Sequence, residues 1–101
     1  MIRIFTLFIS LFIFNFSYAQ EKDFDIAIDY FNQKQYNVAQ LIFENIDSDI
    51  ALLYNAKCSR NLGSEDAIEL FSRLLKDFPF SIYHNEVYSS LAEIYYNDYN
   101  F

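Results

Sequence analysis

Few side chains in this 101-residue sequence could carry out chemistry. His84 is the only histidine and Cys58 the only cysteine, so we expect neither a transition-metal cluster nor a Cys/His or Ser/His/Asp catalytic set. Asp25 and Asp29 are spaced by one helical turn, and paired carboxylates can do acid–base work, but a solvated helix face is the commoner arrangement. We therefore predict a protein that is not an enzyme and that has no catalytic, cofactor-binding or metal site. His84 is interpreted as a solvated surface residue and Cys58 as a small buried hydrophobe, with a redox role or an intermolecular bridge as the alternatives for the thiol.

The N-terminal segment differs in composition from the rest of the chain. Residues 1–19 contain one charged side chain, Arg3, followed by an apolar run over residues 4–14 and by the small residues Ser17 and Ala19. This order is typical of a secretory signal peptide cleaved after Ala19. An uncleaved membrane anchor is the alternative, but the apolar run is shorter than the roughly 18–20 residues that a span needs. A lipid anchor would need a cysteine at the first mature position, where Gln20 stands, so we predict an exported chain without one.

The charge balance limits the classes of partner. The whole sequence has a net charge of −7, and loss of Arg3 with the signal peptide leaves −8. Phosphate backbones and anionic lipid surfaces would repel such a chain, so nucleic acid is not expected as a partner. A protein or peptide partner is expected instead.

Beyond residue 20, apolar residues recur at steps of three and four, which is the period of amphipathic helices. The pattern predicts five helices, over residues 23–32, 36–46, 49–62, 65–78 and 82–97, with Ser64 as the N-cap of the fourth. The only glycine, Gly63, falls where a helix C-terminus needs a left-handed residue, and the only proline, Pro79, ends the fourth helix. Because the connecting loops are short, neighbouring helices should be antiparallel. The predicted fold is all-α, a row of helical hairpins.

A small residue precedes a phenylalanine by one helical turn three times, at Ala27–Phe31, Ala39–Phe43 and Ala67–Phe71. A close helix crossing needs a small residue at the contact and a large one to fill the space beyond it. We therefore predict that these alanines lie at crossings between paired helices, with Ala56 and Ala92 serving the first helices of the second and third pairs.

These residues resemble the signature of the tetratricopeptide repeat. Tyr36 stands three residues before Ala39, Gly63 makes the turn before Ala67, and Pro79 follows Ala67 by twelve residues. The "FPxS…LAxxYY" phrase, which includes Leu91 and Ala92, is similar to tetratricopeptide proteins of the bacterial cell envelope. The spacing from Ala39 to Ala67 is 28 residues, shorter than the usual repeat of about 34.

The resemblance implies stacked hairpins in a right-handed superhelix, with units over about 23–47, 49–79 and 82–101, the last of them partial. It also implies a periplasmic or outer-membrane-associated protein of a Gram-negative bacterium.

Two functions follow as hypotheses. The first is a non-catalytic scaffold that binds a protein or peptide in a groove lined by the first helix of each pair. The candidate groove residues are Asp25, Asp29, Tyr54, Lys57, Arg60, Tyr88 and Glu93. The alternative is an N-terminal sensor or docking arm of a larger exported or membrane protein (an enzyme, kinase or transporter) that continues beyond Phe101. The fifth helix can pack against the fourth on one side only, so apolar side chains on its other side should stay exposed. We therefore also expect self-association through the fifth helix.

Overall fold

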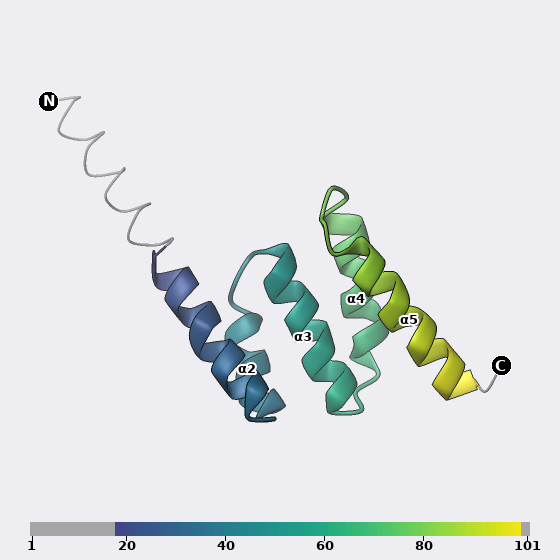
Figure 1. Ribbon diagram of the computed structural model, residues 1–101, viewed down its shortest axis with the longest axis horizontal. Helices are drawn as coiled ribbons and strands as arrows, with labels where there is room; N and C mark the ends of the chain where they lie inside the picture. The colour runs from purple at the N-terminus through teal and green to yellow at the C-terminus, as the bar shows by residue number, and fades with distance from the viewer. Residues whose placement is uncertain (1–17, 100–101) are drawn as a thin grey trace, which may run out of the picture.

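The computed structural model describes residues 18–99, and these residues are helical with no β-strand among them (Figure 1). The first helix is described over residues 18–32. It is followed by α2 (Tyr36–Phe43), α3 (Asp49–Asn61), α4 (Asp66–Asp77) and α5 (His84–Tyr99). The expected all-α class is confirmed for this part of the chain. Most of the predicted signal peptide, residues 1–17, lies outside the described residues.

Consecutive helices run antiparallel and pack in chain order. Figure 1 shows the first helix, α3 and α5 in one row, with α2 and α4 behind it. The contacts between α2 and α3, between α3 and α4 and between α4 and α5 follow that order. We call the side formed by the first helix, α3 and α5 the front row.

The helix boundaries differ from the predicted ones where local hydrogen bonds replace the α-helical pattern. Helix α2 ends at Phe43 rather than Ile46, because Asn45 and Ile46 donate to carbonyls three residues back. Helix α5 begins two residues late, because Ser81 Oγ accepts from the Tyr83 amide and fixes a turn before it. The first helix, by contrast, continues N-terminally past the predicted start at Asp23 to residue 18.

Helix α4 also begins later than predicted and α5 ends two residues later, whereas three other ends are as the sequence predicts. Ser48 caps α3 by accepting from the Ala51 amide. Phe78 has a φ of −126° and a ψ of 69°, outside helical geometry, so α4 stops at Asp77 just before Pro79. Gly63 follows α3 with a φ of 71°.

Two hydrophobic clusters share α3. Ala51 and Cys58 of α3 pack with the first helix and α2, in a cluster that also holds Ala27, Ala39 and Phe43. Other α3 side chains pack with α4 and α5, in a cluster made of Leu52, Leu53, Ala56, Ala67, Phe71, Leu74, Val87 and Ile94. Because α3 contributes to both clusters, this helix connects the N-terminal pair of helices with α4 and α5 through packed side chains.

The repeated alanines Ala27, Ala39 and Ala67 are all buried, whereas Ala92 is exposed, contrary to the contact expected for it. The α3 residues that face the preceding hairpin, Ala51 and Cys58, are seven apart, and so are the buried α5 residues Val87 and Ile94. When α3 and α5 are superimposed on these two pairs of residues, Ala92 of α5 takes the position that Ala56 has in α3. The side chain of Ala56 lies in the cluster that α4 completes, and no described helix completes the corresponding side of α5.

Candidate functional site

The residues predicted to line the groove do not form one open surface. Asp25, Asp29, Tyr88 and Glu93 are exposed, whereas Tyr54, Lys57 and Arg60 of α3 are half-buried. Tyr88 and Glu93 are five residues apart on α5, which places them about 140° apart around the helix axis. The structure therefore brings Tyr88 to a different side of α5 from Glu93.

Tyr54 is half-buried and packs against the hydrophobic cluster of the first helix, α2 and α3. Its ring lies 5.0 Å from that of Phe31 and 6.0 Å from that of Phe24, both edge-on, and it stacks on Phe43 at 5.5 Å. Aromatic pairs in these geometries stabilise a core beyond the area that they bury. One part of Tyr54 is therefore held by these rings, and its role as a contact residue of the groove stays a prediction.

The two α3 cations are already engaged with neighbours. Lys57 Nζ lies 4.9 Å from the centre of the Tyr54 ring and pairs with Glu86 of α5. The Arg60 guanidinium lies 3.8 Å from Asp98, near the end of α5. Among the described residues, Asp25, Asp29 and Glu93 form no ion pair. Both α3 cations of the front row are therefore paired, and the row presents these unpaired carboxylates together with one exposed cation, Lys22 of the first helix.

His84 has a structural contact that the sequence did not indicate. It is half-buried, and its Nε2 lies 2.7 Å from the Phe78 carbonyl oxygen. Its ring also meets the Tyr88 ring edge-on at 6.4 Å. His84 is therefore only partly solvated, because its side chain also bonds the Phe78 carbonyl in the loop around Pro79.

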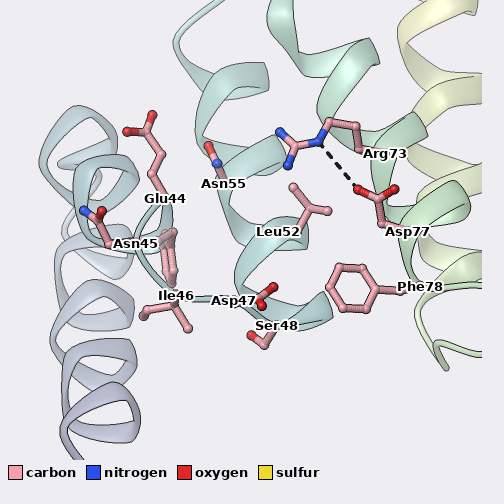
Figure 2. Close-up of a pocket in the computed structure, with 11 residues that line it drawn as sticks. Glu44, Asn45, Ile46, Asp47, Ser48, Leu52, Asn55, Arg73, Asp77 and Phe78 are labelled. Carbon is pink, nitrogen blue, oxygen red and sulfur yellow. Dashed lines mark ion pairs between the residues drawn. The ribbon is translucent and has the colours of Figure 1, made fainter. Parts of the chain in front are cut away.

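A pocket of about 460 Å³ lies between α2, α3 and α4, on the side away from the front row (Figure 2). Its walls are the loop after α2, which includes Glu44, Asp47 and Ser48, and the end of α4 with Arg73, Asp77 and Phe78. A second pocket of about 320 Å³ shares Glu44, Asn55 and Arg73 with it and continues along α4 to Asp66 and Glu69. We call the two together the α2–α4 groove.

The floor of the α2–α4 groove is a polar network. Gln40 Nε2 donates to Asn55 Oδ1 at 2.8 Å and to Ser59 Oγ at 2.6 Å. Asn55 is only 7% exposed, and its Nδ2 makes no hydrogen bond to the described chain. Every fully buried side-chain nitrogen or oxygen in the described residues has a partner, so this Nδ2 must reach the solvent of the groove. The signal that could have found the site is the pair Asn55 and Ser59, polar residues one turn apart among the apolar positions of α3.

Carboxylates dominate the α2–α4 groove. Arg73 is its only cation, and its Nε lies 3.9 Å from Asp77 Oδ2. Five carboxylates line it, from Glu44, Asp47, Asp66, Glu69 and Asp77. No three acidic, histidine or cysteine side chains in the described range converge on a point where they could hold a metal ion. The charge is thus spread along the groove, which suits an extended cationic ligand.

Comparison of the chain with family models, with curated proteins and with solved structures finds no match in any of the three. Within residues 18–99, none of the helices is both long enough and apolar enough to cross a membrane.

Proposed function

We propose that this chain is a non-catalytic protein-interaction module with a tetratricopeptide-like stack of hairpins. The observation that carries the proposal is the sharing of α3 between two hydrophobic clusters. In such a stack each helix is buried against its neighbours and the long sides remain open to a partner. The buried alanines Ala27, Ala39 and Ala67 support the close helix crossings of such a stack, and the right-handed superhelix is the part of the proposal that rests on the family resemblance alone.

The front row is the first candidate contact surface. It offers Asp25 and Asp29 from the first helix and Glu93 from α5, all exposed carboxylates. A protein or peptide partner with a positive surface complements this charge.

Charge reversal tests this surface. Extract of an expressing cell is passed over the immobilised chain, and the retained proteins are compared with those retained by Asp29→Lys and Glu93→Lys variants. Loss of a retained partner in both variants supports the front row. If all three proteins retain the same partners at the same level, the front row is excluded as the contact surface.

A second candidate function is a docking arm of a larger exported or membrane protein. The observation that favours it is the exposed aromatic side of α5, where Tyr88 and Tyr96 are 57% and 66% exposed. A following helix of the same polypeptide would cover this side as α4 covers α3. Sequencing of the reading frame past Phe101 tests it, because a stop codon there leaves no room for such a segment.

We propose export to the periplasm or the outer membrane of a Gram-negative bacterium. The proposal rests on the composition of residues 1–19 and on the resemblance to cell-envelope repeat proteins. N-terminal sequencing of the protein from an expressing cell should read Gln-Glu-Lys-Asp. A protein that still begins at Met1 would refute the cleavage.

A further inference from the structure

The α2–α4 groove combines a strong charge with a concave shape that is open to solvent. Its five carboxylates face a single guanidinium, which Asp77 already neutralises in part. Clefts lined by one sign of charge concentrate the field and draw in ligands of the opposite sign. The occupant of this groove should therefore be cationic.

The wider part of the groove also has an apolar floor. Phe43 and Leu52 are buried beneath it, and Phe78 is half-buried at its edge, as Figure 2 shows for Leu52 and Phe78. Asp47 and Asp77 lie at the rim around these side chains. A lysine or arginine side chain fits this arrangement, because its apolar stem can cover the floor while its charged end meets the carboxylates.

Hydrogen-bond donors distinguish a peptide from a simple cation. Asn55 Nδ2 reaches the groove without a partner in the described chain, and Arg73 lies beside it in the part that both pockets share. A peptide offers backbone carbonyls to these donors, whereas a metal ion or a polyamine offers no acceptor. The carboxylates are also too dispersed for one metal ion.

We propose that the α2–α4 groove binds an extended basic segment of a protein partner, with one lysine or arginine side chain in the pocket between Asp47 and Asp77. The inference deepens the proposed interaction function and rests on it. It assigns the contact to the side opposite the front row. Anionic partners and second copies of this acidic chain are disfavoured there by like-charge repulsion.

The test uses the full chain and a fluorescent ten-residue peptide of alternating lysine and alanine, followed by anisotropy at physiological salt. A glutamate–alanine peptide of equal length is the control ligand. The site variant Glu44→Gln/Asp47→Asn removes two groove carboxylates without touching the Arg73–Asp77 pair. The matched control Asp25→Asn/Asp29→Asn removes the same charge from the front row.

The expected result is saturable binding of the basic peptide, no binding of the acidic one, and a roughly three- to tenfold loss of affinity in the site variant only. In ¹⁵N-resolved NMR spectra, the Asn55 side-chain amide signal should shift on addition of the basic peptide. Equal loss in both variants, binding of both peptides, or an unshifted Asn55 amide would overturn the proposal. Such a failure would leave the interaction function standing if the front-row variants still lose a captured partner.

Discussion

Lys34 and Gly63 have the same backbone conformation at the same point of two successive hairpins. Their φ angles are 62° and 71°, in the left-handed region. After each, the next amide donates to a carbonyl five residues back: Gln35 to Tyr30 and Ser64 to Ser59, both at 2.9 Å. This is the Schellman motif that ends a helix. The two hairpins therefore share one turn geometry. The residue types do not reveal it, because one turn has glycine at this position and the other has lysine.

Substitutions at these two positions should have opposite effects on stability. A non-glycine residue in the left-handed region carries a backbone penalty, so Lys34→Gly should stabilise the fold by about 0.5–1 kcal/mol. A Cβ at Gly63 would meet no atom within 4 Å, so Gly63→Ala should cost about 1 kcal/mol through the backbone alone. Urea unfolding midpoints measure both. Shifts of the same sign would show that the turns are not equivalent.

Enlargement of buried alanines should be costly on both sides of α3. The early position of Ala51 in its helix suggests room for a larger side chain, but Ala51 is fully buried among Ala27, Ala39 and Phe43. Ala51→Leu and Ala67→Leu should therefore each cost about 1–3 kcal/mol. The control is Ala92→Leu, on the exposed side of α5, which should stay within about 0.5 kcal/mol of the parent. Chemical denaturation of the three variants decides whether Ala92 is as open as described.

Cys58 should be unreactive in the folded protein and should make stability depend on alkaline pH. Burial raises the pKa of the Cys58 thiol from 9.0 to about 11, because the thiolate loses its hydration. The unfolded chain then releases the proton at a lower pH than the folded chain. The contribution is fully present below about pH 9 and falls by about 1 kcal/mol per pH unit up to about pH 11.

Two measurements check this. A thiol reagent at pH 8 should label Cys58 only in denaturant. A Cys58→Ala variant should lose the alkaline fall that the parent shows between pH 9 and 11. Rapid labelling of the native protein would contradict the burial of Cys58.

The exposed side of α5 should promote self-association of the isolated chain. Tyr88 and Tyr96 are more than half exposed. Tyr88→Glu/Tyr96→Glu should lower the weight-average mass in sedimentation equilibrium and reduce the binding of a hydrophobic dye. Leu41→Glu is the matched control, because Leu41 is 64% exposed on α2 and lies apart from α5. A parent that sediments as a monomer without binding dye would refute the prediction.

The sequence by itself determined the helices and several of their ends. Ser48, Gly63 and Pro79 act through the backbone of their immediate neighbours, so their effects can be predicted without knowing what packs where. The three alanines spaced one turn before a phenylalanine also predicted buried contacts, because the helical period alone places such residues on one face. The ends at Phe43 and His84 differ from the prediction, because they depend on short-range hydrogen bonds that many sequences could form.

Only the tertiary structure decided which residues with polar side chains contact other parts of the chain instead of solvent. Tyr54 packed against aromatic rings, Lys57 and Arg60 paired with α5, and His84 bonded the Phe78 carbonyl. Each of these outcomes depends on a partner far along the chain or on a loop path. The α2–α4 groove could not be predicted for the same reason. Its carboxylates come from the loop after α2 and from α4, and only the way α2 and α4 cross α3 leaves an open space between them. Helical period fixes the face on which a residue lies, whereas the packing of neighbouring helices fixes whether that face is covered.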